Sequence, residues 1–145
     1  MPELPEVETT VRGIAPYLVN TCFDFVRIHH AGLRWPIPSE FSALLTGARC
    51  VQVERRAKYI LIHTTERTVL AHLGMSGSFR LVAPGTPLKT HDHVQIGLGE
   101  LELRYHDPRR FGCMLWADSE RGQTLLSSLG PEPLTDAFDG LVLYR

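Results

Sequence analysis

Short apolar runs, each the length of a β-strand, fill the middle of this 145-residue chain. They lie at 51–53, 59–62, 69–73, 79–82, 94–98 and 101–105, and glycine, proline or aspartate separates them. Several short apolar runs with turn residues between them are typical of antiparallel sheets that pack as a sandwich or close into a barrel. The pattern therefore predicts a mainly β protein, and within it a tight hairpin at 98–101.

Helical spacing is found near the two ends and in one short internal segment. Apolar residues three or four apart mark one face of a helix that begins near Pro5, and these are Val7, Val11, Ile14 and Leu18. Pro16 is expected to end or kink this helix. A second, short helix is expected over 38–47, and a third, capped by Asp118, through Leu129. The predicted fold is a β-sandwich with a packed N-terminal helix and short extra helices.

Composition narrows the class of protein. The apolar runs are too short to span a membrane, and acidic residues stand where a signal peptide would be basic, so we expect a cytoplasmic protein without membrane contact. The three cysteines are widely spaced and include no Cys-x-x-Cys pair, which favours free thiols over disulfides or a cysteine zinc site. The formal net charge of −1 is unexpected for a self-sufficient nucleic-acid binder.

The amino terminus could act as a reagent. Removal of Met1 would leave Pro2 with a free secondary amine, and an α-amino group with a pKa of about 8 is partly neutral at physiological pH. Condensation of this amine with an aldehydic sugar carbon gives an iminium ion that has no N–H to lose and stays an electron sink. With Met1 attached, the nitrogen is a tertiary amide and cannot attack.

Two glutamates accompany this amine. Glu3 is adjacent to it and could donate a proton for opening a deoxyribose ring, and Glu6 could order water or orient the helix start. Acidic residues at helix starts are also routine without any such role. The combination of these residues in Pro2-Glu3-Leu4-Pro5-Glu6-Val7-Glu8-Thr9 is far more specific than any one of them.

This octet resembles the opening signature of bacterial formamidopyrimidine-DNA glycosylase, the 8-oxoguanine repair enzyme. The sister endonuclease VIII group typically has glycine where Leu4 stands, so the resemblance favours the formamidopyrimidine branch. Further stretches follow in the family's order and extend the resemblance over nearly the whole chain: 33–36, 55–59, 72–77, 91–94, 107–112 and 129–134.

The resemblance implies a bifunctional DNA glycosylase and AP lyase of base excision repair. Such an enzyme extracts an oxidised purine, 8-oxoguanine or a formamidopyrimidine, from damaged double-stranded DNA. Pro2 would attack the sugar C1′, form a Schiff base and cleave the strand by successive β- and δ-eliminations. Lys58 follows two arginines at the edge of a predicted strand, where a surface lysine is the simple interpretation. The resemblance instead implies that Lys58 contacts DNA and assists base excision and β-elimination.

Two large apolar side chains occupy loops of small residues, where a role in the core is a poor explanation. Met75 lies in Gly-Met-Ser-Gly and Phe111 in Arg-Arg-Phe-Gly. Exposed apolar wedges fit a protein that pushes a base from a duplex, and Arg110 could then hydrogen-bond the orphaned partner base. Met75, Arg110 and Phe111 resemble the family's void-filling triad. For Arg109 we expect an ordinary ion pair with Asp107 or Glu102.

Alternate histidines on a strand raise the question of a metal site. His91 and His93 share a face, but a cupin-like site would need a glutamate three or four residues after His93, and Glu100 is seven away. We therefore predict no metal site here. The resemblance makes His91 a contact to the DNA backbone, whereas Asp92 and His93 are expected to be structural.

The resemblance also predicts the domain organisation. Residues 1–130 would form the N-terminal catalytic β-sandwich domain, and 131–145 would begin the linker to a helix-two-turn-helix and zinc-finger half. That half, its zinc and most of the DNA clamp would lie outside these 145 residues, so we expect no cofactor in this chain. The whole would be a monomeric, nucleoid-associated bacterial protein.

Two functional hypotheses follow. The first is a glycosylase/lyase domain that acts as part of a longer protein or very weakly alone. The second is a non-catalytic DNA-binding or structural module that lacks its C-terminal clamp. An unrelated small β-protein enzyme would need a metal or cofactor motif that the sequence does not contain.

Overall fold

The computed structural model describes residues 4–129 of the chain. Within them it contains three helices, α1 (Leu4–Leu18), α2 (Phe41–Leu45) and α3 (Glu120–Ser127). The strands in the same range are β1 (Phe25–Ile28), β2 (Cys50–Arg56), β3 (Tyr59–Thr64), β4 (Thr68–His72), β5 (Ser78–Val82), β6 (Asp92–Gly97), β7 (Glu102–His106) and β8 (Cys113–Trp116). The predicted mainly β composition is confirmed, and β1 and β8 are additions to the strands predicted from the sequence.

The described strands form two antiparallel, four-stranded sheets in the orders β1-β6-β7-β5 and β2-β3-β4-β8. Their facing sides share one hydrophobic core, which includes Val53, Ile60 and Ile62 from one sheet and Ile96, Leu103 and Tyr105 from the other. The predicted β-sandwich is therefore confirmed. The predicted hairpin between β6 and β7 is also present, with Leu98 N–H donating to the carbonyl of Leu101 at 2.8 Å.

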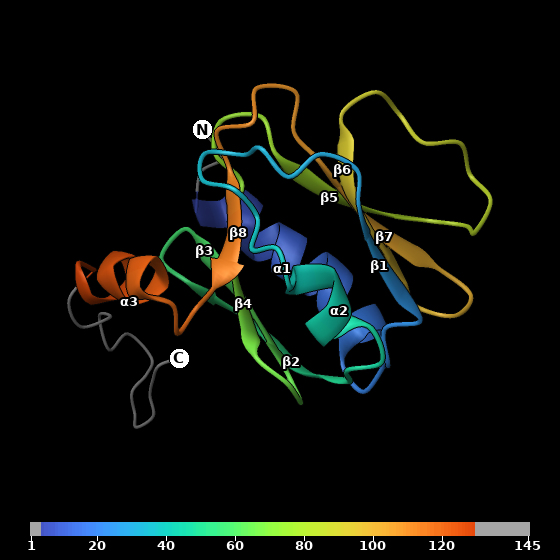
Figure 1. Cartoon of the computed structure of the whole chain (residues 1–145), viewed down its shortest axis with the longest axis horizontal. Helices are drawn as coiled ribbons and strands as arrows, with labels where there is room; N and C mark the ends of the chain where they lie inside the picture. Colours follow the sequence, from blue (N-terminus) through green and yellow to red (C-terminus); the bar gives the residue numbers. More distant parts are fainter. Residues whose placement is uncertain (1–3, 130–145) are drawn as a thin grey trace.

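Helices close the two open sides of the sandwich (Figure 1). Helix α1 contacts the edge strands β2 and β5 and buries the apolar stripe predicted from the sequence, which is Val7, Val11, Ile14 and Leu18. Helix α2 contacts β1, and its Phe41 ring lies 5.0 Å from the ring of Trp116 in β8. Pro16 does not end α1, which continues to Leu18, a fully buried residue whose packing in the core holds the last turn.

The start of α3 differs from the prediction by one residue. Ser119 is the N-cap, and its hydroxyl accepts a hydrogen bond from Gly122 N–H at 3.1 Å. Asp118 was wrongly predicted in this role, because its carboxylate instead accepts from Arg67 Nη2 at 2.6 Å.

None of the helices in the described part of the chain is long and apolar enough to cross a membrane. The predicted domain boundary at 130 lies outside the described residues.

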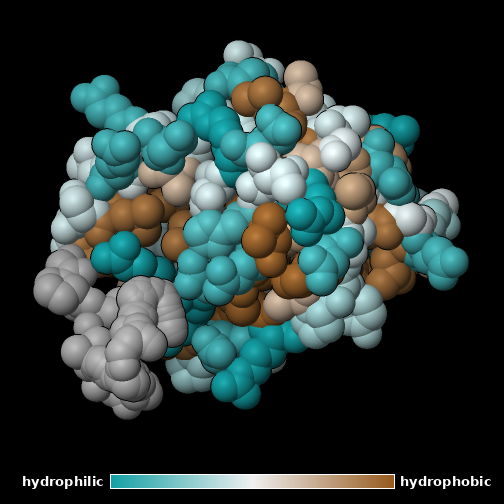
Figure 2. Space-filling model, turned by 90° about the horizontal axis from the view of Figure 1, so that it is seen from below, coloured by the Kyte–Doolittle hydropathy of each residue, from teal (hydrophilic) through white to brown (hydrophobic). Residues whose placement is uncertain are grey.

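Strand register gathers several connections at one end of the molecule. Tyr59 pairs with both Arg56 and His72, and His72 also pairs with Cys113, so the β2–β3 turn and the loops 73–77 and 107–112 leave this sheet at the same end. The start of α1 lies toward this end too, at the upper left of Figure 1. Viewed from below, the opposite end shows hydrophobic patches broken up by hydrophilic residues (Figure 2).

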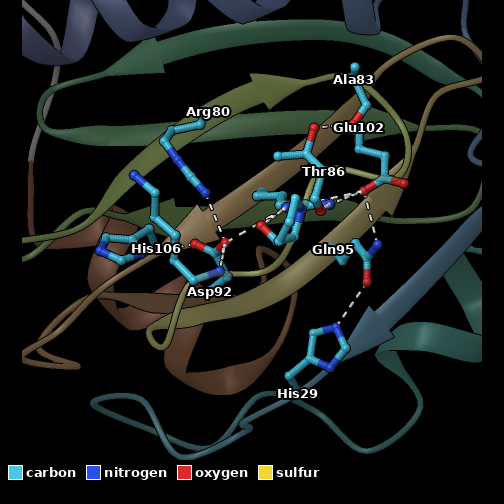
Figure 3. A network of polar contacts seen from close by, with 11 residues as sticks. His29, Arg80, Ala83, Thr86, Asp92, Gln95, Glu102 and His106 are labelled. Atoms are coloured by element: carbon cyan, nitrogen blue, oxygen red, sulfur yellow. Dashed lines mark hydrogen bonds and ion pairs between the residues drawn. The ribbon is translucent and has the colours of Figure 1, made fainter.

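A polar network covers the outer face of the sheet β1-β6-β7-β5 (Figure 3). Arg104 is 1% exposed and donates from Nη2 to Glu102 Oε1 at 2.8 Å and to the carbonyl of Thr86 at 2.7 Å. Asp92 accepts from Arg80 Nη2 and from Lys89 N–H, each at 2.8 Å. These contacts hold the loop 83–91 over the sheet, so that both faces of β6 are buried. His91 is the last residue of this loop and is held directly before the strand.

Candidate functional site

The two apolar side chains predicted to be exposed are exposed. Met75 and Phe111 retain 49% and 48% of their accessible surface, although each is large and hydrophobic. They lie on the loops 73–77 and 107–112, at the end of the sandwich where α1 begins (Figure 1). Exposed apolar groups of this size on neighbouring loops are characteristic of a surface that inserts into or binds a partner.

The two loops contact each other backbone to backbone. Gly74 has a φ of +63°, and a Cβ there would lie 2.5 Å from Gly112 N and 2.6 Å from the carbonyl carbon of Phe111. Any side chain larger than hydrogen would therefore force the loops apart. Gly74, which precedes Met75, is thus required by the close approach of the two loops, whereas Gly112, which follows Phe111, leaves room for the hydroxyl of Tyr105 and the carbonyl of His72.

Asp107 joins the two loops through its carboxylate. It is fully buried, and Oδ1 accepts from Ser76 Oγ at 2.7 Å and from Arg110 N–H at 3.0 Å. Its other oxygen, Oδ2, accepts from Tyr105 Oη at 2.7 Å and from Gly112 N–H at 2.9 Å. Four donors from three segments therefore converge on one side chain, which fixes both loops relative to β7.

Arg110 adopts a left-handed backbone conformation, with a φ of +59°. Its exposed guanidinium donates from Nη1 to His30 Nε2 at 2.6 Å, so the imidazole orients it from outside the loop. Arg109 does not form the predicted ion pair with Asp107 or Glu102 among the described residues. Its backbone N–H donates to Ser76 Oγ at 3.1 Å, and its guanidinium lies 3.8 Å from Met75 Sδ. Asp107 instead accepts from Ser76, Tyr105, Arg110 and Gly112, and Glu102 Oε1 accepts from Gln95 and Arg104.

His91 lies half-buried beside this cluster, in a hollow of about 340 Å³. The hollow is lined by His29, His30, Thr90, His91, Asp92, His93, Pro108 and Arg110. Asp92 directs its carboxylate to Arg80, Lys89 and His106, and these hydrogen bonds outweigh the effect of burial and hold its pKa below the usual range. Arg110 and the exposed edges of the histidines thus line this hollow together with the engaged Asp92.

His93 is structural, as expected. Its Nε2 contacts the backbone carbonyl of Asp107 at 2.7 Å, and burial lowers the pKa of His93.

No cluster of three or more His, Cys, Asp or Glu side chains within residues 4–129 is arranged to hold a metal ion. Of the three cysteines, Cys50 and Cys113 are buried and Cys22 is exposed, and all are free.

Lys58 lies in the β2–β3 turn and is half-buried. The preceding Ala57 has a φ of +52°, and its carbonyl accepts from Arg55 Nη1 at 3.0 Å. Arg55 also donates from Nε to Glu8 Oε1 of α1 at 2.9 Å. Burial alone would raise the pKa of Glu8, but its hydrogen bonds to Arg55 and Arg12 lower it. The charged Glu8 therefore ties the turn that carries Lys58 to the first half of α1.

The remaining predicted residues belong to the amino terminus. Pro2 and Glu3 lie outside the described residues. Glu6 is exposed in the first turn of α1, where its backbone carbonyl accepts from the hydroxyl of Thr10 at 3.0 Å. The described start of α1 and the turn that carries Lys58 thus lie at the same end as Met75, Arg110 and Phe111.

A second hollow, of about 390 Å³, lies behind the exposed apolar tips. Arg34, Trp35, Tyr59, His72, Gly74, Met75, Phe111, Cys113 and Leu125 line it. Burial and the positive charges of Lys58 and Arg34 lower the pKa of His72, whose Nδ1 accepts from Gly74 N–H at 3.0 Å. Burial raises the pKa of Cys113 to about 12, so its thiol is not a nucleophile.

Sequence reasoning missed the residues that support the site. It assigned no role to His30 or His72 and considered Asp107 only as a partner of Arg109. Asp107 precedes a proline and two arginines. This pattern indicates a turn, but it does not indicate a buried carboxylate that accepts hydrogen bonds from several segments. His30 meets Arg110 across 80 residues of chain, and no local pattern indicates that contact.

Solved structures of the formamidopyrimidine-DNA glycosylase from Lactococcus lactis share this fold. One, bound non-covalently to DNA that contains an AP site, has a TM-score of 0.81 and 28% identity and covers 95% of this chain and 54% of that chain. Another, in complex with DNA that contains N7-benzyl-Fapy-dG, has a TM-score of 0.81 and 29% identity and covers 95% and 52%. The fold is thus that of a DNA glycosylase domain.

The family model described as the formamidopyrimidine-DNA glycosylase N-terminal domain matches residues 1–114, and the chain therefore belongs to this family. The formamidopyrimidine-DNA glycosylase of Methylococcus capsulatus is 54% identical over 147 residues, covering 100% of this chain and 54% of the relative. That of Pseudomonas aeruginosa strain LESB58 is 56% identical over 146 residues, with the same coverage. The chain spans about half the length of these curated relatives.

Proposed function

We propose that this chain is the catalytic half of a bifunctional DNA glycosylase and AP lyase of base excision repair. Its substrates are oxidised purines, 8-oxoguanine and formamidopyrimidines, in damaged double-stranded DNA, on which it acts as a single chain. The observation that carries the proposal is the pair of exposed tips, Met75 and Phe111, fixed beside Arg110 at the end of the sandwich where α1 begins. Membership of the family supports the same conclusion.

The exposed tips suit the energetics of base extrusion. Removing a base from the duplex costs a few kcal/mol, least where the base is damaged. Burying a whole Met or Phe side chain contributes about 1.5–3 kcal/mol, so burying the exposed halves of Met75 and Phe111 contributes about 2 kcal/mol together. This is of the same order as the cost, so the two side chains can fill the vacated stack and offset much of the unstacking.

Arg110 is placed to hold the partner base. A guanidinium has several N–H donors, and one of them is engaged by His30 at 2.6 Å. The remaining donors can reach a base edge that has lost its partner. The hollow beside it, which His91 lines, takes a DNA phosphate in this proposal.

The covalent chemistry belongs to the amino terminus. Once Met1 is removed, the nitrogen of Pro2 attacks C1′ of the sugar and gives up its proton, and the bond from C1′ to the base breaks as the departing base takes up a proton. A proton from an acid such as Glu3 to the ring oxygen then opens the ring and leaves an iminium ion. The resulting iminium ion accepts the electron pair released when C2′ loses a proton, and the 3′ phosphate leaves. Elimination of the 5′ phosphate follows. Lys58 assists excision and elimination from the turn that Arg55 and Glu8 hold in place.

Binding strength is expected to come largely from elsewhere. The net charge of −1 offers little general attraction to phosphates, which supply most of the affinity of DNA-binding proteins. In this proposal a C-terminal half with a helix-two-turn-helix region and a zinc finger completes the clamp. The three cysteines of this chain do not gather in the described structure, so the zinc ligands would come from that half.

Borohydride trapping tests the proposal. The chain is incubated with a duplex that contains one 8-oxoguanine, and sodium borohydride reduces any Schiff base to a stable protein–DNA adduct. We expect an adduct with the damaged duplex, none with an undamaged duplex of the same sequence, and none with Pro2→Gly. Salt-dependent binding without any adduct at high protein concentration would contradict the proposal and favour a non-catalytic DNA-binding module.

A further inference from the structure

Asp107 contacts both of the loops that carry the exposed tips Met75 and Phe111. Its side chain contacts the loop 73–77 through Ser76 and its own loop through the N–H groups of Arg110 and Gly112. Its backbone carbonyl contacts His93, and its N–H donates to the carbonyl of His91 at 3.0 Å. One residue thus links the two tips to His91, the predicted phosphate contact, which immediately precedes β6.

We propose that Asp107 is the positioning residue for base extrusion: its buried carboxylate sets the distance between the Met75 and Phe111 tips and the direction of Arg110. This inference rests on the proposed function of the same site. It assigns Asp107 no part in the covalent steps at the sugar. Loss of the carboxylate should therefore impair removal of a stacked base far more than cleavage at a sugar that has already lost its base.

The chemistry of the site requires a carboxylate and not merely a polar group. Asp107 accepts two hydrogen bonds at each oxygen, and two of the four donors are backbone N–H groups that cannot turn away. An asparagine has the same shape but replaces one oxygen with an NH₂ donor. In either orientation of the amide, this NH₂ would face the N–H of Arg110 or of Gly112. Asp107→Asn is therefore a nearly isosteric change that removes at least one of the hydrogen bonds by which residue 107 holds the two loops together.

The loop is held in a conformation that depends on these bonds. Arg110 has a φ of +59°, which a non-glycine residue adopts only when its surroundings impose it. Its N–H is held both by the carboxylate of Asp107 at 3.0 Å and by the carbonyl of Asp107 at 3.2 Å. Without the carboxylate the loop can relax toward ordinary backbone angles, which displaces Phe111. Misplacement by about 1 Å can lower a catalysed rate by about 100-fold.

The decisive experiment compares two duplexes in single-turnover reactions with the full chain. One duplex contains 8-oxoguanine opposite cytosine, and the other contains a preformed abasic site at the same position. For Asp107→Asn we expect excision of 8-oxoguanine to fall by about 10- to 100-fold and nicking at the abasic site to change by less than about threefold. The matched control is Asp118→Asn, which alters an exposed aspartate paired with Arg67 and should change neither rate. An equal loss on both duplexes, or no loss on either, would overturn the proposal.

Amide hydrogen exchange on the free protein separates this inference from the proposed function. In Asp107→Asn, we expect exchange at Arg110 and Gly112 to become at least about tenfold faster, while amides of β3 and β4 keep their protection. Ser76→Ala removes one of the four donors and should give an intermediate effect on the loop 73–77. If wild-type protein acts on neither duplex, the proposed function fails, and exchange still decides the inference. Unchanged exchange in Asp107→Asn would overturn it.

Discussion

Replacing Arg104 with methionine tests whether the polar network on the outer sheet face holds the loop 83–91. The guanidinium is 1% exposed and donates to Glu102 Oε1 from Nη2 at 2.8 Å and from Nε at 3.2 Å. It also donates to the carbonyls of Thr86 at 2.7 Å and of Pro87 at 3.1 Å. Methionine fills a similar volume but offers no donor, so the buried carboxylate of Glu102 loses its ion pair and keeps only the hydrogen bond from Gln95, and the two loop carbonyls lose this donor. Asp92, 3.9 Å from Arg104 Nη1, keeps Arg80.

The magnitude follows from the burial of the pair. Removing one member of a buried, hydrogen-bonded ion pair costs about 3–5 kcal/mol, because the other charge stays buried. For a domain of this size, each kcal/mol lowers the melting temperature by about 3–4 °C. Arg104→Met should therefore lower the melting temperature by about 10–20 °C. Arg80, whose side chain is 25% exposed and has one ion pair, to Asp92, should cost less when replaced by methionine.

Thermal and urea unfolding, followed by circular dichroism, measure the effect. The double variant Arg104→Met/Glu102→Met removes both charges and should recover part of the lost free energy of unfolding, because no carboxylate at position 102 is then left unpaired. Hydrogen exchange should show that the loop 83–91 opens in the single variant. A loss below about 1 kcal/mol for Arg104→Met would refute the reasoning, as would a double variant that is no more stable than the single one.

Two further predictions concern histidines. Because burial and nearby positive charges lower the pKa of His72, the unfolded chain binds its proton at a higher pH than the folded chain does. The free energy of unfolding should therefore be level above about pH 6.5 and fall as the pH drops below it. Urea titrations at pH 5–8 should show a shallower fall in His72→Gln, and an identical slope would contradict the assignment. His30→Leu removes the acceptor for Arg110 and should reduce discrimination between cytosine and adenine opposite 8-oxoguanine by about 3- to 10-fold, measured as a ratio of single-turnover excision rates. An unchanged ratio would show that the contact does not orient the guanidinium.

Local sequence patterns predicted most of the fold. The buried face of α1 and six strands followed from periodicity and turn residues, which act between near neighbours in the chain. The four-residue strands β1 and β8 gave too short a signal, and their places depend on pairing with β6 and β4, far away in the sequence. The N-cap of α3 was misplaced because Asp118 and Ser119 are equally suited to capping by type, and the ion pair with Arg67 decides between them.

In the candidate site, too, features that depend on neighbouring residues were predictable, and contacts between distant parts of the chain were not. Met75 and Phe111 were predictable as exposed groups because each is a large apolar residue in a short glycine-containing loop, where no neighbouring apolar residues indicate a place in the core. The supporting contacts were not predictable, because Ser76 meets Asp107 across 31 residues and His30 meets Arg110 across 80. Arg109 does not form the predicted ion pair with Asp107 for the same reason. The donors that an aspartate contacts depend on which groups the fold places beside it, and beside Asp107 one of these is the N–H of Arg110.

The central claim, that Pro2 is the nucleophile, is tested most directly by locating the trapped DNA on the protein. After borohydride trapping on an 8-oxoguanine duplex, the adduct is digested with nuclease and trypsin, and the modified peptide is sequenced by mass spectrometry. Cleavage after Arg12 isolates the amino-terminal peptide 2–12. We predict a reduced deoxyribose remnant on the nitrogen of Pro2 in a peptide that has lost Met1. A remnant on Lys58, or on a peptide that retains Met1, would contradict the account.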